Sequence, residues 1–503
     1  MRVILLDIDT LRPDHLGCYG YHRNTSPAID EIAADSMRFN NYHCSDAPCL
    51  PSRASLVTGK FGIHTGIINH GGVACEPEHT GKDRFMFDQQ IVNNLFFIFR
   101  SADMHTVSFS TFAERHTAYW FNSGFNETYN VGKIGSETAE EVMEPALDWL
   151  KRNKDRKNMF MHIHMWDPHF PYNAPMSYGN PFENDPLPKW LTEEVVEKNK
   201  SHIGPHSAHE LNMFNDVEKK EKFPRTPGNV MDMAQARRVI DGYDTDVRYV
   251  DDQIRKLTDY LKAEGIYEDT AIIITADHGE NLGELGIYSE HATADYITTR
   301  IPLIIKWPGM VKGVDEGLHY NIDLTRTIAD LLGQKPIYDG DGESFIETLK
   351  NGKDTGRDAL IVSQCAHVCQ RAVRFEDYMY IRTYHDGYHL FPKEMLFNIK
   401  EDPHEQVDLA KQLPEICEKA SKILMDWEEE MMLTSRFDKD PMWIVLREGG
   451  PFNCSGRLGE YIERLEKTGR SAGAEELRRR HPNEVNNKKK IPVLPEAFAK
   501  NAP

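Results

Sequence analysis

Short continuous runs of apolar residues recur through the N-terminal part of the chain, with helical patterns between them. The runs cover residues 3–6, 159–165, 271–275 and 301–305. Runs of this length without alternation are typical of strands that are buried on both faces, as in a parallel sheet. The pattern therefore predicts an α/β fold in which helices cover both faces of a mostly parallel sheet.

The clearest helical pattern lies directly before the third of these runs. Apolar side chains recur there at spacings of three and four, and they are Val239, Tyr243, Val247, Val250, Ile254, Leu257 and Leu261. Gly265 is a typical helix stop, and the strand over 271–275 follows it. We therefore predict a long helix over 231–263 that is buried along one side.

A polar segment over 181–229 interrupts this alternation of strands and helices. It is rich in proline and charge and has little periodicity, which indicates a long insertion. Two interpretations stand side by side, a lid over a site and a solvated excursion without a role. His202, His206 and His209 lie within the insertion, and we do not expect them to form a second metal site.

The pattern changes again after about residue 356. Alternating segments predict an antiparallel sheet, and they cover residues 359–363, 372–375 and 378–384. A helix is expected over 413–432, followed by an extended tail. We therefore divide the chain into a catalytic α/β domain over 1–355 and a smaller C-terminal α+β subdomain over 356–503.

The composition narrows the classes of partner. Lys and Arg number 59 against 79 Asp and Glu in 503 residues, which gives a formal net charge of −20. This balance argues against a nucleic-acid-binding protein, whereas a small anionic substrate is compatible with a locally basic pocket. No stretch approaches the ~20 apolar residues that span a bilayer, and the N-terminal run is too short for a signal peptide. We therefore expect a cytoplasmic protein that contacts no membrane.

Carboxylates stand where two of the predicted strands end. Asp7 and Asp9 point to the same face of the first run, and Asp277 and His278 follow the run over 271–275. Ligands in open α/β sheets bind at the carboxyl ends of strands, so we expect the two ends to meet. Oxygen ligands with one imidazole suit a divalent cation, with Ca²⁺ favoured and Mn²⁺ or Mg²⁺ open. The alternative for each end is a simple capping carboxylate.

The most specific pattern is residues 49–60, which read Cys-Leu-Pro-Ser-Arg-Ala-Ser-Leu-Val-Thr-Gly-Lys. This segment resembles the signature of the type I sulfatases, Cys-x-Pro-Ser-Arg followed by a helix that ends near Thr-Gly. Further segments resemble the same family in the same order, and they cover residues 9–17, 167–172, 275–280, 300–309 and 396–410. The resemblance implies an alkaline-phosphatase-like fold, with a large mixed, mostly parallel sheet sandwiched by helices.

The resemblance also implies a chemistry. In this family a dedicated maturation enzyme oxidises the cysteine, here Cys49, to formylglycine. One oxygen of the hydrated aldehyde attacks sulfur, and the other allows the aldehyde to re-form as sulfate leaves. Residue 49 is then nucleophile and metal ligand, and Arg53 orients it. Asp9, Asp277 and His278 hold a metal that offsets the charge of the sulfate ester.

Two positions depart from the family pattern at the metal. Many relatives have Asp-Asp where this chain has Ile8-Asp9, so Asp7 as a further direct ligand is left open. The second metal motif often ends in Asn and here ends in His278. An Asp-His pair also occurs in related hydrolases of phosphonate monoesters and phosphodiesters. That reaction is therefore the alternative to hydrolysis of a sulfated sugar or a small organic sulfate.

A third hypothesis, a non-catalytic homologue that only binds anions, is disfavoured because the nucleophile, its arginine and the metal residues are all present. The sequence leaves the oligomeric state open, including a homo-oligomer.

Histidines are the remaining candidates for catalysis. His169 lies in the segment that resembles the family's active-site histidine motif, and we expect it to protonate the leaving group. The family's Lys-x-His element is missing, and the nearest candidates are Arg115 as a sulfate clamp and His116 as the base. His291 occupies the place of the family's final active-site lysine, where it could hold sulfate or donate the proton. His70 could line the pocket or be a loop histidine without a role.

Overall fold

The computed structural model describes residues 1–77, 94–218, 220–335 and 340–486. Among these residues, eight strands form one large sheet, in the spatial order β11 (Gly313–Tyr320), β2 (Met37–His43), β10 (Leu303–Lys306), β7 (Thr270–Thr275), β1 (Arg2–Ile8), β6 (Met159–Met165), β4 (His105–Phe109) and β5 (Glu127–Tyr129). All of them run in one direction except β10, which is antiparallel to both of its neighbours. The predicted mixed, mostly parallel sheet is confirmed.

The prediction of a parallel strand over 301–305 is wrong. The chain between β7 and β10 stays beside the carboxyl end of the sheet, where it forms β8 (Asn281–Leu282), β9 (Tyr288–Glu290) and α10 (Tyr296–Thr299). No helix in this connection crosses back to the opposite edge, as a parallel neighbour would require. The next strand must therefore run back towards the start of β7.

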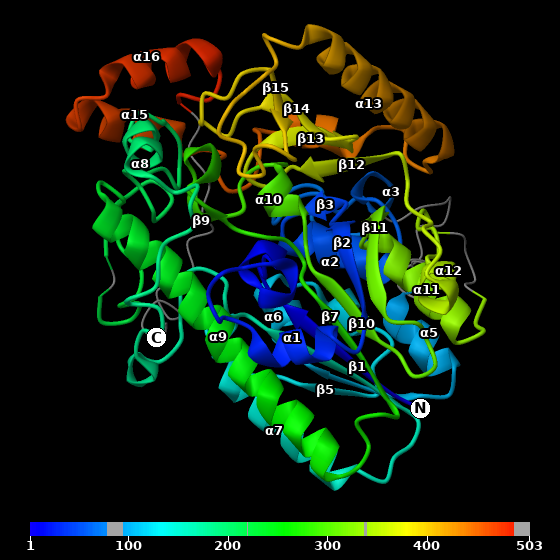
Figure 1. Cartoon of the computed structure of the whole chain (residues 1–503). Coiled ribbons are helices and arrows are strands. Elements are labelled where there is room, and N and C mark those ends of the chain that lie inside the picture. Colours follow the sequence, from blue (N-terminus) through cyan, green and yellow to red (C-terminus); the bar gives the residue numbers. More distant parts are fainter. Residues whose placement is uncertain (78–93, 219, 336–339, 487–503) are drawn as a thin grey trace, which may run out of the picture.

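Helices cover both faces of the large sheet (Figure 1). One face carries α1 (Pro27–Ala33), α7 (Ala139–Arg152) and α9 (Met233–Ala263), and the other carries α2 (Cys49–Thr58), α5 (Leu95–Ser101) and α11 (Ile322–Leu331). The long helix α9 begins two residues after its predicted start, where the Asp232 side chain accepts a hydrogen bond from Gln235 N. Every apolar side chain of the predicted stripe is buried in α9.

A second sheet lies beyond the carboxyl end of the large one, at the top of Figure 1. Its spatial order is β15 (Glu394–Asn398), β14 (Tyr378–His385), β13 (Cys369–Phe375), β12 (Ala359–Gln364) and β3 (Asp46–Ala47). The helix α13 (Pro414–Thr434) packs on it. Four of these strands follow residue 356, but β3 comes from the N-terminal part and pairs in parallel with β12. The two predicted domains therefore share a sheet.

The chain after residue 453 is helical where an extended tail was expected. It forms α15 (Leu458–Lys467) and α16 (Ser471–Arg480), and α14 (Pro441–Arg447) precedes them. Leu458, Tyr461 and Leu465 recur at spacings of three and four and bury one face of α15 in a small core with Tyr388. This short periodicity is the reason for the helix. The last part of the predicted tail, 487–503, lies outside the described residues.

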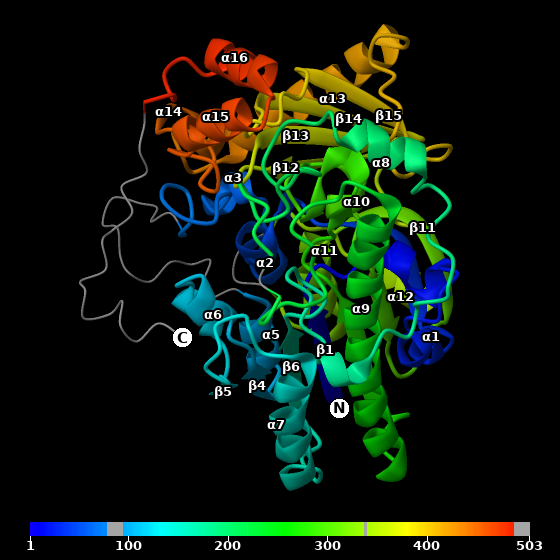
Figure 2. The ribbon, with the colours of Figure 1, turned by 90° about the vertical axis from the view of Figure 1, so that its left-hand side faces the viewer.

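The polar segment over 181–229 is packed into the molecule. It contains α8 (Glu193–Asn199), and its buried apolar side chains are Phe182, Leu191, Val196, Ala208, Leu211 and Phe214. A bridge joins Ser207 to Ile287, just before β9. Figure 2 shows α8 next to the C-terminal strands. The interpretation of this segment as a solvated excursion is therefore wrong.

The remaining short helices are α3 (Gly62–Thr65), α6 (Phe112–Arg115) and α12 (Ile346–Asn351). Within the described residues, the helices are all too short or too polar to cross a membrane.

Candidate active site

The site lies at the carboxyl edge of the large sheet because several connections leave the sheet there. The strands β1, β2, β4, β6 and β7 run in the same direction. Asp9 follows β1, Asp277 follows β7 and His169 follows β6, while β2 leads through β3 into α2. Side chains that are far apart in sequence therefore meet at one edge.

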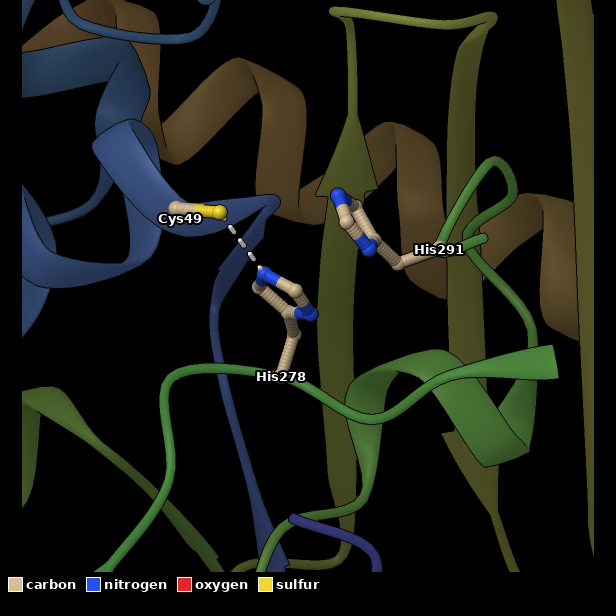
Figure 3. Close-up of side chains that lie close together, drawn as sticks. All are labelled: Cys49, His278 and His291. Carbon is tan, nitrogen blue, oxygen red and sulfur yellow. Dashed lines mark hydrogen bonds between the residues drawn. The ribbon is translucent and has the colours of Figure 1, made fainter. Parts of the chain in front are cut away.

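Cys49 is the first residue of α2 and is 2% exposed. Its Sγ lies 3.1 Å from His278 Nε2 (Figure 3). The N-terminus of this ten-residue helix favours negative charge at the position of residue 49. Burial, reinforced by the charge of Asp9, raises the pKa of the Cys49 thiol to about 12. The unmodified side chain is therefore a protonated thiol near neutral pH, and thus a weak nucleophile.

The serine of the signature segment fixes the position of α2. Ser52 Oγ donates a hydrogen bond of 2.6 Å to the backbone oxygen of Asp277. Asn321 Nδ2 in turn donates to the backbone oxygen of Ser52 at 3.1 Å. These buried contacts join α2 to the end of β7, so Cys49 is held in register with Asp277 and His278.

Arg53 lies among three buried carboxylates. Its Nε and Nη2 contact the two oxygens of Asp7 at 2.9 and 3.0 Å, and its Nη1 contacts Asp9 at 2.9 Å and also Asp277. Burial acts to raise the pKa of Asp7 and of Asp9, but the charge of Arg53 lowers both below their usual range. The Arg53 guanidinium also lies over the ring of Phe112, at 5.1 Å from its centroid. The predicted action of Arg53 on residue 49 stays a prediction.

Four buried side chains converge in a way that fits a divalent cation: Asp9, Cys49, Asp277 and His278, with ligand atoms within 4.8 Å of one another. Asp9 Oδ1 is buried and has no hydrogen-bond partner among the described residues. Asp7, Asp9 and Asp277 carry three negative charges and Arg53 carries one positive charge. With His278 neutral, as a metal ligand must be, the two remaining negative charges match a divalent ion. Asp7 lies outside the group of four, and its role as a direct ligand stays a prediction.

Two further histidines support the carboxylates, and sequence reasoning missed both. His162 and His164 lie on β6, with Nε2 atoms 3.4 Å from Asp7 Oδ2 and 3.5 Å from Asp9 Oδ2. Their Nδ1 atoms each meet a serine hydroxyl of the β4 segment at 2.9 Å. Imidazoles at alternate positions of an otherwise apolar strand were the available signal, because alternate residues share one face.

His291 lies beside Cys49 and His278, with ligand atoms within 4.8 Å of one another, and His169 lies next to His291; the catalytic roles of both histidines stay predictions. Their ring centroids are 5.4 Å apart, and the ring of His291 is 4.0 Å from that of His278. Figure 3 shows His291 and His278 on the same side of Cys49. Burial lowers the pKa of His169 to about 4, although the charge of Asp9 acts in the opposite direction.

The other predicted residues lie around His291 and Trp166. The ring of His70 is 5.2 Å from that of His116 and 6.5 Å from that of His291. Burial lowers the pKa of His116 to about 3. Arg115 is exposed and stacks over Trp166 at 4.9 Å, so it lies at the rim of the histidine group. Its role as a sulfate clamp, and that of His116 as a base, stay predictions.

Comparison with known proteins assigns this arrangement to a family. Residues 2–334 match the family model described as Sulfatase. The chain belongs to the sulfatase family. Members of this family generally use a metal and a formylglycine, and the four converging side chains fit both.

Curated relatives of this sulfatase are distant but cover most of its length. An ulvan-active sulfatase of Formosa agariphila is 25% identical over 81% of this chain and 76% of its own. An N-acetylglucosamine-6-O-sulfatase of Bacteroides thetaiotaomicron is 22% identical over 89% of both chains. A multifunctional alkaline phosphatase superfamily protein of Trinickia caryophylli is 23% identical over 76% of this chain and 85% of its own.

Solved structures share the fold. One is a protein in complex with its substrate D-glucosamine-2-N,6-O-disulfate, with a TM-score of 0.69, 18% identity and coverage of 88% of this chain and 99% of that one. Another is the phosphonate monoester hydrolase of Agrobacterium radiobacter, with a TM-score of 0.65, 18% identity and coverage of 86% and 96%. At this identity the likeness establishes the alkaline-phosphatase-like architecture.

Proposed function

We propose that this sulfatase hydrolyses the sulfate ester of a sugar through a formylglycine formed from Cys49. The observation that carries the proposal is the convergence of residue 49 with Asp9, Asp277 and His278 at one buried point. The names of two curated relatives, an ulvan-active sulfatase and an N-acetylglucosamine-6-O-sulfatase, support a sulfated sugar as the substrate class. The maturation enzyme that oxidises Cys49 is a required partner.

The charged residues around residue 49 have different roles in the proposed reaction. Asp9, Asp277 and His278 would hold the cation, which supplies electrophilic stabilisation of the sulfate oxygens. The oxygen-rich set favours Ca²⁺, with Mn²⁺ or Mg²⁺ as alternatives. Arg53 offsets the carboxylates, so that the site does not repel an anion. As a hydrated aldehyde, residue 49 supplies both the attacking oxygen and a route to release sulfate.

Two histidines act on the substrate's own atoms. His169 follows β6, its ring lies 5.4 Å from that of His291, and it protonates the oxygen of the leaving sugar. His291 lies 4.0 Å from the ring of His278 and holds a sulfate oxygen, where relatives in this family carry a lysine. The two assignments predict a different dependence of kcat/KM on the leaving group. Kinetics on an alkyl sulfate and an aryl sulfate therefore distinguish them.

The specific competitor is hydrolysis of phosphonate monoesters, favoured by His278 and by the shared fold of a phosphonate monoester hydrolase. The test compares kcat/KM for an aryl sulfate and an aryl phosphonate monoester with the same leaving group, in protein made with a maturation enzyme. We expect the sulfate to be preferred by at least about tenfold, a margin of about 1.4 kcal/mol in activation free energy. Cys49→Ala is the control and should be inactive on both substrates. Preference for the phosphonate would overturn the proposed function.

A further inference from the structure

A second group of metal-ligating side chains surrounds one carboxylate next to the nucleophile. Glu290 Oε1 lies 2.9 Å from His291 Nε2 and 3.6 Å from His367 Nε2. The other oxygen, Oε2, lies 3.1 Å from His206 Nε2. Three imidazoles therefore face a single, largely buried carboxylate.

These four residues come from three distant parts of the chain. His206 belongs to the insertion over 181–229, Glu290 and His291 follow one another at the end of β9, and His367 lies between β12 and β13. The three histidines are 3–6% exposed, and the Glu290 side chain is 12% exposed. The insertion, the large domain and the C-terminal subdomain thus each contribute to one enclosed group.

The hydrogen bonds of His206 indicate which of its nitrogens carries the proton. Its Nδ1 lies 2.9 Å from the backbone oxygen of Leu211, which can only accept, so Nδ1 is the donor. In the neutral ring, Nε2 then presents a lone pair towards Glu290. This nitrogen is buried and has no hydrogen-bond partner among the described residues. A ring that donates from one nitrogen to a carbonyl and offers the other nitrogen is the usual arrangement of a metal-ligating histidine.

His367 Nε2 lies 3.6 Å from Glu290 and at present accepts a hydrogen bond from a neighbouring amide. Asn453 Nδ2 lies 2.6 Å from His367 Nε2 and donates to it, so a cation at this nitrogen would displace that amide. Burial lowers the pKa of His206, and it lowers that of His367 to about 3, so both rings are neutral near pH 7. A neutral imidazole lone pair and a carboxylate about 3 Å apart repel one another, and either a shared proton or a bound cation offsets that repulsion.

The separations are close to those in the coordination sphere of zinc. Tetrahedral ligands at 2.0–2.2 Å from Zn²⁺ lie roughly 3.3–3.6 Å apart. The contacts of Glu290 are 2.9, 3.1 and 3.6 Å, so two of the three ligand pairs must separate slightly to admit the ion. The ligand atoms of Glu290, His291 and His367 are mutually within 4.8 Å. We propose that these three residues, with His206 on the second carboxylate oxygen, bind a second divalent cation of the zinc class.

This site is chemically distinct from the one beside Cys49. Its imidazole-rich set suits Zn²⁺, whereas the carboxylate-rich set of Asp9 and Asp277 suits a harder ion. His291 belongs to the new group through Nε2 and also packs against His278. The second cation would therefore lie next to the position proposed for the sulfate. The proposal does not depend on which ester the enzyme cleaves.

The test measures metal binding directly. Untagged full-length protein is stripped with a chelator, dialysed against saturating Ca²⁺, and titrated with Zn²⁺, with bound metal determined by mass spectrometry. We expect one tightly bound Zn²⁺ per chain in the wild type, and at least tenfold weaker binding in Glu290→Gln and in His367→Gln. Bound Co²⁺ should give the visible absorption of a tetrahedral site in the wild type and lose it in these variants.

Two control variants make the result decisive. Asp277→Ala should keep the Zn²⁺, and so should His404→Ala, which removes a histidine that pairs with Glu284 outside the group. Circular dichroism and thermal melting identify any variant that fails to fold. If Glu290→Gln or His367→Gln does not fold, His206→Ala is measured in its place, with the same loss of Zn²⁺ affinity expected. Equal Zn²⁺ affinity in the wild type and Glu290→Gln would overturn the proposal. Loss of the Zn²⁺ in Asp277→Ala alone would assign the ion to the first site and overturn it as well.

Discussion

Replacement of His169 by alanine should separate substrates by their leaving group. An alkoxide is a poor leaving group, and a positioned acid typically contributes about 10²–10⁴-fold to the rate. We therefore expect kcat/KM for a sugar or alkyl sulfate to fall by that factor in His169→Ala. An activated aryl sulfate, whose phenolate leaves without a proton, should lose less than about tenfold.

The pH dependence follows from the burial of His169. Burial lowers its pKa to about 4, so at pH 7 only about one ring in a thousand carries the proton. The protonated form grows about tenfold for each pH unit down to that pKa. The ratio of kcat/KM on alkyl sulfate to kcat/KM on aryl sulfate should therefore rise between pH 7 and pH 5 in the wild type. In His169→Ala the ratio should be flat.

The matched variant is His291→Ala. If His291 holds sulfate, its loss should reduce kcat/KM on both substrate types about equally, with no change in the ratio. Steady-state kinetics of wild type and both variants, on both substrates at several pH values, form the assay. Swapped patterns would reverse the two assignments, and a flat ratio in the wild type would refute the acid role of His169.

Three other predictions concern the oxidation of Cys49, the ion pairs of Arg53 and the stability of the C-terminal subdomain. In protein made with a maturation enzyme, the peptide that contains Cys49 should be lighter by about 18 Da in mass spectrometry, the change from thiol to aldehyde. Arg53→Ala should lower the free energy of unfolding in urea by about 3–5 kcal/mol, because it leaves buried carboxylates unpaired; a loss below about 1 kcal/mol would contradict the ion-pair argument. Although burial acts to lower it, the pKa of His481 is raised to about 9 by Asp386 and Glu484. Its stabilisation, about 1–3 kcal/mol, should be complete below pH 6.5 and be lost as pH rises through 9, and His481→Gln should lack this loss.

The parts of the site that follow strand ends could be predicted from the sequence. Asp9 and Asp277 directly follow apolar runs, and strands that run in the same direction bring such positions to one edge. Cys49 and Arg53 belong to a local signature in which each residue has its own contact in the structure. These positions need only short-range patterns and the direction of the chain.

The remaining parts depend on tertiary packing. Nothing near His206 in the sequence indicates that it meets Glu290, because the contact arises only when the insertion packs against β9. His367 reaches the same carboxylate from the C-terminal subdomain. The direction of β10 depends on where its preceding connection lies. The apolar periodicity of α15 is so short that the sequence suggests an extended tail there. Each of these features pairs segments that are far apart in the chain.

Under the proposed function, the pairing of β3 with β12 limits the period in which Cys49 can be oxidised. In the folded protein the thiol is buried in α2, and Ala47, two residues before it, pairs with Gln364. A catalyst that needs an accessible segment must act before that pairing forms. Residue 364 is made 315 residues after residue 49, which takes about 15–60 s at roughly 5–20 residues per second. The fraction of active molecules therefore depends on how fast Cys49 is oxidised relative to the synthesis of residues 50–364. Slower translation of these residues should raise that fraction.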